Sequence, residues 1–160
     1  MGSLRLVYVS DKYAKYLFKF DKKVPLNKNE KRPYLGVLLT VCNHKYYAPL
    51  TSPKPKFANM HNTDDFMRID NGNLGAINFN NMIPVVDSAI IEIDFNKLSD
   101  FRYKLLLISQ LRWLNENDIN IIEKAQRLYE KFKQKKLHKS IYDRCVDFNL
   151  LEEKSKLYRC

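Results

Sequence analysis

The stretch HKYYAPLTSPKPK, residues 44–56, decides the fold because it joins a run of β-forming residues to a stiff loop. Residues 34–41 are rich in the residue types that favour a strand, and residues 45–50 are predicted to form the second strand of a hairpin with them. Pro49, Pro53 and Pro55 fix their own φ angles and bias the residue before each of them toward an extended backbone. We therefore predict a strand that leads into a rigid loop.

The loop carries the chemical groups that a phosphate site needs. Thr51 and Ser52 supply hydroxyls, and Lys54 and Lys56 supply ammonium groups. Groups that are in place before a substrate arrives stabilise developing charge better than groups that must first be ordered. Thr51, Ser52 and Lys54 are therefore our candidate catalytic residues, and Lys56 is a neighbour that would assist them.

This set of residues suits a metal-free route to cutting RNA. In that route the ribose 2′-OH is the nucleophile, and the protein orients it, stabilises the charged phosphorane and manages a proton on each side. Lys54 would neutralise the phosphorane, while Thr51 and Ser52 would hydrogen-bond phosphate or 2′-OH oxygens. At this point a proline-stiffened basic loop without any chemistry remains the alternative.

Other chemistries lack their usual patterns. The four glycines form neither a phosphate-binding loop nor a dinucleotide fingerprint, and Ser52 lacks the flanking glycines of a hydrolase nucleophile turn. The three cysteines are odd in number and have no short paired spacing, so we expect reduced thiols. No cofactor and no metal ion are expected, because several carboxylates show no recognised ligand spacing. These are Asp64, Asp65, Asp70, Asp87 and Asp94.

Composition restricts the partner and the compartment. A chain of 160 residues is long enough to bury its own core, and we expect residues 1–160 to form one domain. A formal charge of +10 favours a polyanionic partner. Nucleic acid fits better than a membrane, because the sequence has no apolar run of about 18 residues. We therefore expect a cytoplasmic protein that binds RNA and no membrane.

Short strands are predicted on both sides of the central stretch. A strand at residues 4–9 is followed by a short helix that Ser10 or Asp11 could cap. Turns are predicted at residues 42–44 and 70–73, the second of which contains Asn-Gly, a strong hairpin signal. Residues 22–33 read as a loop, and residues 57–65 receive no regular structure. The remaining strands are predicted at residues 34–41, 45–50, 66–69, 76–79, 82–86 and 89–95.

From residue 97 onward the apolar residues recur at helical spacing. A helix capped by Ser99 or Asp100 is expected to end at residues 115–117, Asp118 is expected to cap a second helix, and residues 148–158 form a third. The second helix is basic along residues 124–139. The predicted apolar faces are Leu105, Ile108, Leu111, Trp113 and Leu114 in the first helix, and Ile119, Ile122, Ala125, Leu128, Tyr129 and Phe132 in the second.

Several segments together resemble a known family. The run KYYAPLTSPK, residues 45–54, is similar to the central motif of the ToxN/AbiQ family, the endoribonuclease toxins of type III toxin-antitoxin systems, with CptN/TenpN-like relatives included. The resemblance continues, in the same order, across most of the chain. The other segments are Tyr13 with Lys15 and Tyr16, residues 20–25, residues 74–79 with 82–84, and residues 150–154.

The resemblance implies both a fold and an activity. The implied fold is α+β, with a compact, strongly twisted antiparallel sheet or partial barrel surrounded by helices, similar to the Kid/MazF-like toxins. The implied activity is metal-independent, sequence-specific RNA cleavage that leaves a 2′,3′-cyclic phosphate and a 5′-OH. The implied partner is a small repeated RNA that folds as a pseudoknot, inhibits the toxin and joins it in a closed assembly. Such systems act in abortive infection of phage-infected cells.

The family's functional residues fall on matching positions of this sequence. The catalytic group falls on Thr51, Ser52 and Lys54, with Tyr13 and Arg32 as neighbours that bind or orient RNA. Arg32 stands where a relative would have Lys, and its guanidinium does not readily give up a proton. Further candidate RNA contacts come from the residues around the motif and from the basic helix. They are His44, Lys45, Tyr46, Lys56, Lys131, Lys133, Lys135 and Lys136.

Two functions remain open on the sequence. The first is the endoribonuclease toxin, and the second is a basic RNA-binding protein without catalytic activity. Both predict RNA binding that weakens as salt is added. Only the first predicts cleavage in the presence of EDTA that is lost when Ser52 or Lys54 is replaced. His61 and His138 have no partner pattern and read as surface residues.

Overall fold

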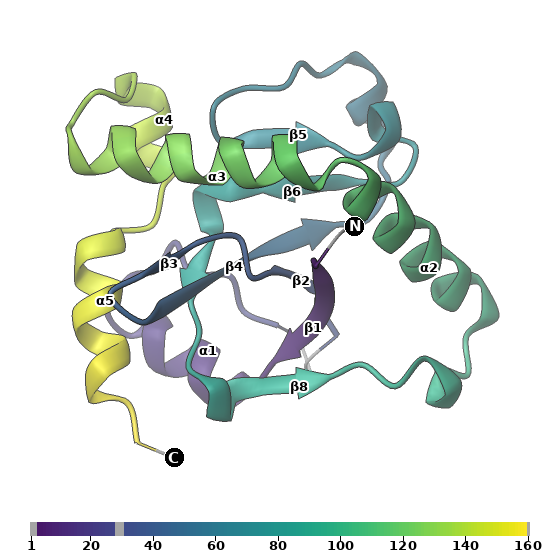
Figure 1. The fold of residues 1–160 in the computed structure, drawn as a ribbon, viewed down its shortest axis with the longest axis horizontal. Coiled ribbons are helices and arrows are strands. Elements are labelled where there is room, and N and C mark those ends of the chain that lie inside the picture. Colours follow the sequence, from purple (N-terminus) through teal and green to yellow (C-terminus); the bar gives the residue numbers. More distant parts are fainter. Residues whose placement is uncertain (1–2, 28–30, 160) are drawn as a thin grey trace.

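The computed structural model describes residues 3–27 and 31–159, in which helices surround an antiparallel sheet (Figure 1). The strands follow the order β5-β6-β4-β2-β1-β8, and β3 and β7 also pair with β4. This architecture confirms the predicted α+β class. The strands are β1 (Arg5–Val9), β2 (Tyr34–Gly36), β3 (Thr40–Val41), β4 (His44–Thr51), β5 (Phe66–Arg68), β6 (Ala76–Asn78), β7 (Ile83–Pro84) and β8 (Ile90–Glu92).

β4 is the strand around which the sheet is built. Its first half pairs with β3 and β7, and its second half pairs with β2 and β6, always antiparallel. The partner changes from β7 to β6 between Tyr47 and Leu50, so Pro49 lies where a residue without an N–H is tolerated. Six of the eight residues of β4 are buried, as its run of apolar and aromatic side chains leads one to expect.

The hairpin before β4 differs in detail from the prediction. The predicted strand at residues 34–41 is interrupted between β2 and β3, although Leu38 N still donates to Tyr46 O at 2.9 Å. Cys42 and Asn43 alone form the turn, with φ of 49° and 69°, which is the conformation of a two-residue hairpin. His44 therefore begins β4, opposite Val41, and is not part of the turn.

The predicted hairpin at residues 66–79 is confirmed as β5 and β6. Its connection is longer than a two-residue turn, because the one-turn 3-10 helix Asp70–Gly72 lies within it. Another short 3-10 helix, Pro55–Asn59, occupies part of the region that the sequence left unassigned. Pro55 starts that helix, where a fixed φ and a missing N–H are both acceptable. The loop after β4 thus ends in ordered backbone.

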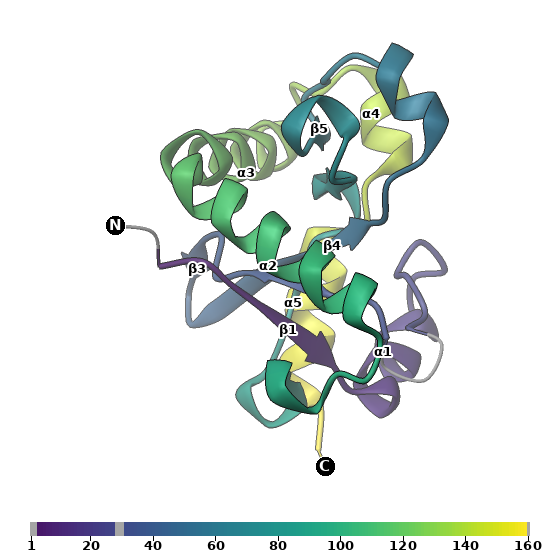
Figure 2. The same ribbon diagram turned by 90° about the vertical axis from the view of Figure 1, so that its right-hand side faces the viewer.

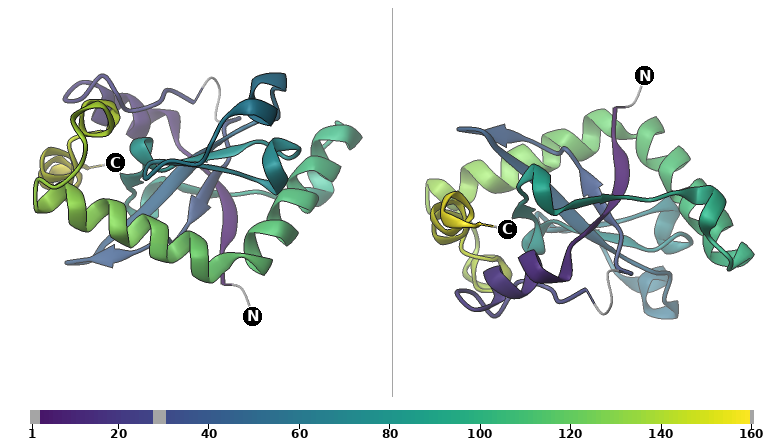
Figure 3. Two further views of the ribbon diagram at one scale, coloured as in Figure 1. Left: turned by 90° about the horizontal axis from the view of Figure 1, so that it is seen from above. Right: turned by 90° about the horizontal axis from the view of Figure 1, so that it is seen from below.

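Helices cover the sheet on both faces. Figure 3 shows α1 (Asp11–Phe18) and α3 (Asp118–Lys133) on opposite sides of the strands, which cross one another at large angles. α5 (Phe148–Leu157) lies beside the end of the sheet where β4 begins. α2 (Phe101–Glu116) runs into α3 through a bend at Asn117, as Figure 2 also shows. Asp100 caps α2, as predicted, by accepting from Tyr103 N.

The predicted faces of α2 and α3 are partly wrong. Leu105 is 47% exposed and Ile119 is 69% exposed, whereas Leu107 and Ile121 are fully buried. Apolar residues occupy four consecutive positions in α2, residues 105–108, so sequence period alone does not identify the face that meets the sheet. Packing against β1 and the bend before α3 select it.

The basic segment is also shorter as a helix than predicted. α3 ends at Lys133, and Lys135 has a φ of 58°, the left-handed conformation that often follows a helix. A separate helix, α4 (Lys139–Arg144), follows and was not predicted. Lys135 and Lys136 therefore lie in a connection between two helices. In the part of the chain that is described, no helix has the length and apolar character needed to cross a membrane.

Candidate active site

The candidate catalytic residues lie at the C-terminal end of β4. Thr51 is the last residue of the strand and pairs with Ala76, and Ser52 and Lys54 follow it with exposed side chains. Phe57, only 3% exposed, anchors the far end of the loop, and Phe57 N donates to Lys54 O at 3.0 Å. The exposed residues are thus held between a sheet strand and a buried ring.

Two glycines allow the β5–β6 connection to support this loop at close range. A Cβ atom on Gly75 would lie 2.1 Å from Thr51 O, and a Cβ atom on Gly72 would lie 2.8 Å from Phe57 Cβ. Both glycines also have positive φ, at 104° and 93°, where other residues are strained. Backbone of the connection therefore packs directly against both ends of the loop.

Thr51 is oriented by a neighbour on β6. Asn78 Nδ2 donates to Thr51 Oγ1 at 2.5 Å. A hydroxyl has one hydrogen to donate and can accept on its lone pairs. Because Thr51 Oγ1 accepts from Asn78, its own hydrogen remains available to a ligand oxygen.

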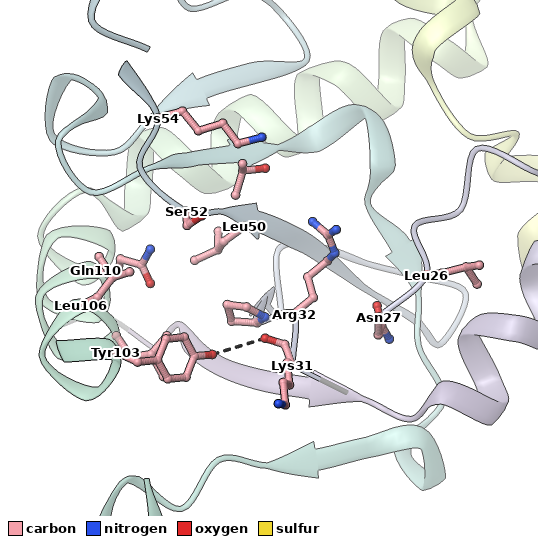
Figure 4. Close-up of a pocket in the computed structure, with 13 residues that line it drawn as sticks. Leu26, Asn27, Lys31, Arg32, Leu50, Ser52, Lys54, Tyr103, Leu106 and Gln110 are labelled. Atoms are coloured by element: carbon pink, nitrogen blue, oxygen red, sulfur yellow. Dashed lines mark hydrogen bonds between the residues drawn. The ribbon is translucent and has the colours of Figure 1, made fainter. Parts of the chain in front are cut away.

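A cavity of about 460 Å³ opens beside these residues. Figure 4 shows the Arg32 guanidinium and the Lys54 ammonium pointing into the same opening, with Leu50 and Ser52 beside them. Arg32 Nε is buried and has no hydrogen-bond partner within residues 3–27 and 31–159. Lys31, Arg32 and Lys54 all line the cavity, and none of the described residues that line it is a carboxylate. The opening is therefore cationic and suits an anion.

A second hollow, of about 440 Å³, lies on the other side of Thr51 and Lys54, which line both. Lys56 and His61 also line it, so His61 is closer to the candidate catalytic group than its sequence context suggested. Asp65 is the buried acid of this hollow. The Arg144 guanidinium binds both of its carboxylate oxygens at 2.9 Å, and Thr63 Oγ1 donates to Oδ1 at 2.8 Å. This acid therefore has its own cation and leaves the charge of Lys54 uncompensated.

The pKa of Asp65 reflects the same contacts. Burial by itself raises the pKa of this carboxyl, but the hydrogen bonds and charge of Arg144 and the hydrogen bond from Thr63 outweigh burial. The net result is a pKa below the ordinary value, so Asp65 is ionised at neutral pH.

At the other end of β4 the predicted RNA contacts are buried. Tyr46 is fully buried, and its hydroxyl donates to Glu152 Oε2 at 2.5 Å. Tyr13 is also fully buried, beneath the sheet, and donates to Pro84 O at 2.5 Å. Neither side chain presents surface to RNA in this structure, because both were drawn into the core by their large apolar rings.

His44 is likewise a core residue and not an exposed turn histidine. It is 9% exposed, and its Nδ1 lies 3.2 Å from Ser155 Oγ in α5. Burial lowers the pKa of His44, as do the nearby charges of Lys156 and Lys133, although Glu152 opposes them. His44 lies at the opposite end of β4 from Thr51, so the structure does not place it in the candidate catalytic group.

The remaining predicted lysines have differing surroundings. Lys45 forms an exposed ion pair with Asp87 at 3.2 Å, and Lys131 binds Asp64 at 3.1 Å. Lys133 contacts Glu152 at 3.2 Å and also Asn149. Lys135 and Lys136 are exposed. None of the five lines either cavity.

Residues that the sequence did not single out complete the site. Asn78 orients Thr51, while Asn27, Tyr103 and Gln110 line the first cavity. They come from β6, from the loop after α1 and from α2, which no local pattern connects. Within the described ranges, no group of three or more His, Cys, Asp or Glu side chains could hold a metal ion.

The fold matches those of solved toxin structures. A structure of AbiQ, a lactococcal anti-phage endoribonuclease belonging to the type-III toxin-antitoxin system, has a TM-score of 0.85 at 31% identity, covering 98% of each chain. A structure that concerns selective toxin inhibition by a non-coding RNA pseudoknot in type III systems has a TM-score of 0.83 at 31% identity, covering 97% of each chain. The fold is therefore that of a toxin of this class.

Sequence comparison gives the family. Residues 5–156 match the family model of the toxin ToxN of type III toxin-antitoxin systems, so this chain belongs to that family. The endoribonuclease ToxN of Bacillus thuringiensis subsp. kurstaki is 35% identical over 159 residues, which are 94% of this chain and 82% of that protein. The resemblance seen in the sequence is confirmed.

Proposed function

We propose that this chain is a metal-independent endoribonuclease toxin that cleaves RNA at the cavity beside Thr51, Ser52 and Lys54. One observation carries the proposal: the hydroxyls of Thr51 and Ser52 lie with the cations Lys54 and Arg32 at an opening that has no carboxylate among its described lining residues. Such a set binds a phosphate and stabilises additional negative charge on it. The relatives named above are endoribonucleases of the same family.

The reaction proceeds by attack of the ribose 2′-oxygen on the adjacent phosphorus. The 2′-OH loses its proton, the new O–P bond forms, and the bond from phosphorus to the 5′-oxygen breaks as that oxygen gains a proton. The products are a 2′,3′-cyclic phosphate and a 5′-OH. Because the nucleophile belongs to the substrate, the protein supplies orientation and charge, which a metal-free site can provide.

Each residue has a role that follows from its position. The Lys54 ammonium and the Arg32 guanidinium neutralise the charge that develops on the nonbridging oxygens. Thr51, whose oxygen accepts from Asn78, donates its hydrogen to a phosphate oxygen. Ser52, exposed at the mouth of the cavity, hydrogen-bonds a phosphate or 2′-OH oxygen. Lys56 binds an adjacent phosphate from the second hollow.

Control by a folded RNA follows from the same site. One related structure describes selective toxin inhibition by a non-coding RNA pseudoknot. An RNA product whose fold adds contacts outside the cavity would remain bound after cleavage and exclude other substrates. We propose such an inhibitor for this chain, joined with it in a closed assembly, with Lys45, Lys131, Lys133, Lys135 and Lys136 as phosphate contacts. We also propose that residues 1–160 form one domain, which acts in the cytoplasm during phage infection.

The test is cleavage of a defined RNA by the purified chain in EDTA, with analysis of the ends. The expected result is cyclic phosphate and 5′-OH ends, which are lost in Ser52→Ala and retained in Ser99→Ala, a matched change at an exposed serine. Binding without cleavage by the unchanged chain would support the alternative, an RNA-binding protein without activity.

A further inference from the structure

The cavity contains a buried acceptor that the proposed reaction does not use. Gln110 in α2 is 2% exposed and lines the cavity together with Thr51, Ser52 and Lys54. Its Nε2 donates to Leu74 O at 2.9 Å, which fixes the orientation of the amide because a carbonyl can only accept. Gln110 Oε1 is buried and has no hydrogen-bond partner within the described ranges.

A buried carbonyl without a hydrogen-bond partner is costly and uncommon. Its position on a cavity wall therefore indicates that a ligand supplies the missing donor. Around it the wall is apolar, formed by Leu50, Tyr103, Leu106 and Leu107. Figure 4 places Gln110 and Leu106 on one side of the cavity and Arg32 and Asn27 on the other. The cavity thus has a cationic side, and a largely apolar side where Gln110 Oε1 is an unpaired acceptor.

A nucleotide likewise has a charged part, the phosphate, and a largely apolar part, the base. Its phosphate suits the part with Lys54 and Arg32, while a flat base suits the apolar wall and offers hydrogen-bond groups only along its edge. Adenine, cytosine and guanine each carry an amino group that projects from the ring and can donate to a carbonyl. The one ring N–H on the pairing edge of uracil is flanked by two carbonyl oxygens, which would face the same acceptor.

We propose that Gln110 is a specificity-determining residue, whose Oε1 accepts a hydrogen bond from the amino group of an RNA base held in this cavity. The inference rests on the proposed function and names a feature of its substrate. The site selects an amino-bearing base over uracil next to the phosphate that is cleaved. Gln110 does not touch the reacting atoms and is not a catalytic residue.

The placement of Gln110 also links base selection to the reacting groups. Its partner Leu74 precedes Gly75, whose backbone packs directly against Thr51. The same short segment of the β5–β6 connection thus holds the Gln110 amide and packs against the Thr51 backbone. A base that reaches Gln110 would therefore lie in the same cavity as Thr51.

The experiment begins with a defined RNA that the unchanged protein cleaves at a mapped site. Near that site, each amino-bearing base is replaced in turn by its analogue without the amino group: adenine by purine, cytosine by 2-pyrimidinone, and guanine by hypoxanthine. At one position we expect kcat/KM to fall on the order of ten- to hundredfold, because the analogue leaves the carbonyl unpaired. Other positions should change little.

The same substrates are then compared in Gln110→Met, which keeps the length of the side chain but removes the acceptor. This variant should cleave the parent RNA and the analogue at the selected position at equal rates. Gln126→Met, a matched change at an exposed glutamine on α3, should discriminate as the unchanged protein does. If Gln110→Met does not fold, Gln110→Asn withdraws the carbonyl by one methylene and should also lose discrimination.

Two results would overturn the inference. One is cleavage of every analogue by the unchanged protein at the parent rate, and the other is full discrimination in a folded Gln110 variant. Both leave the nuclease proposal intact, since RNA is still cut. Failure to cut any RNA would instead contradict the proposed function itself.

Discussion

The two ends of β4 carry similar residue types and use them in opposite ways. At the N-terminal end, the hydroxyls of Tyr46 and Tyr129 and the ammonium of Lys133 all converge on Glu152. At the C-terminal end, Lys54 forms no ion pair among the described residues, although Asp65 lines the neighbouring hollow. The first arrangement holds the protein together, and the second leaves charge available for a ligand.

The two ends of β4 differ in which cations bind the acids, and not in how many polar groups are present. Burying a charge is costly unless it is paired, so the Glu152 cluster is saturated with donors. The carboxylate of Asp65 is equally engaged, by Arg144 and Thr63. Among the described residues, no acid forms an ion pair with Lys54 or Arg32, which keeps the cavity attractive to a phosphate. A cation that lines a cavity and has no ion pair is thus a better indicator of a ligand site than a cation that is paired with an acid.

The most severe test of the comparison removes the cation at the open end. Lys54→Ala should lower the cleavage rate on the order of a hundredfold to a thousandfold, because one charge matters much in a transition state. RNA affinity and thermal stability should change little. Lys97→Ala, at an exposed lysine outside both hollows, is the control. Normal cleavage by Lys54→Ala would remove this residue from the mechanism.

The converse test removes Glu152, the acid at the N-terminal end of β4. Glu152→Ala should reduce the free energy of unfolding by about 2–4 kcal/mol, because two buried tyrosine hydroxyls and Lys133 lose their acceptor. Urea titration measures this loss, and cleavage per folded molecule should stay within a fewfold of normal. A stable Glu152→Ala protein without activity would show that this end of β4 belongs to the site after all.

A smaller effect is expected where the sheet supports the site. Asn78→Leu removes the donor to Thr51 Oγ1 and should lower kcat about tenfold, because the hydroxyl loses its orientation. The KM should change less than kcat. Asn78→Ser, which keeps a donor on a shorter side chain, should recover part of the rate. An equal loss in both variants, together with reduced stability, would indicate a structural role only.

Much of the comparison could be predicted from the sequence, because its cause is local. Pro53, Pro55 and the hydroxyls and cations between 51 and 56 lie in one short run, so the sequence predicts the loop and its candidate catalytic group together. Arg32 lies in another segment, and its role is implied by the resemblance to the family. The cluster around Glu152 at the N-terminal end of β4 could not be predicted, because Glu152 reaches Tyr46 only after α5 packs beside β4. For the same reason Tyr13 and Tyr46 were assigned to RNA although packing buries them.

Acidic pH should lower the stability of the folded protein through His44, at the N-terminal end of β4. The pKa of His44 in the folded protein is lowered, chiefly by burial, so the unfolded chain binds more protons near and below its ordinary value of about 6.5. The contribution of neutral His44 to stability is present in full above the ordinary pKa of about 6.5. It is lost as the pH falls through the lowered pKa that His44 has in the folded protein. Urea midpoints measured from pH 8 to 5 should decline, and His44→Gln should decline less. Parallel declines in both proteins would assign the effect to other groups.

The smallest effect is expected at the connection between α3 and α4, which lies outside both hollows. Lys135 and Lys136 are exposed and have no ion pair among the described residues, whereas Lys131 and Lys133 are already bound to Asp64 and Glu152. If an ion pair weakens the contact of a lysine with RNA, replacing Lys135 and Lys136 with Gln should weaken binding of inhibitor RNA more than replacing Lys131 and Lys133 does, and should leave stability unchanged. Each lost phosphate contact should lower the slope of log K against log salt by about 0.7 to 0.9. The matched control, Lys12→Gln in α1 with Lys19→Gln directly after it, replaces two exposed lysines on another face. An unchanged salt slope in Lys135→Gln with Lys136→Gln would show that exposure without a partner is not enough, and that a cation must also lie beside a cavity to bind RNA.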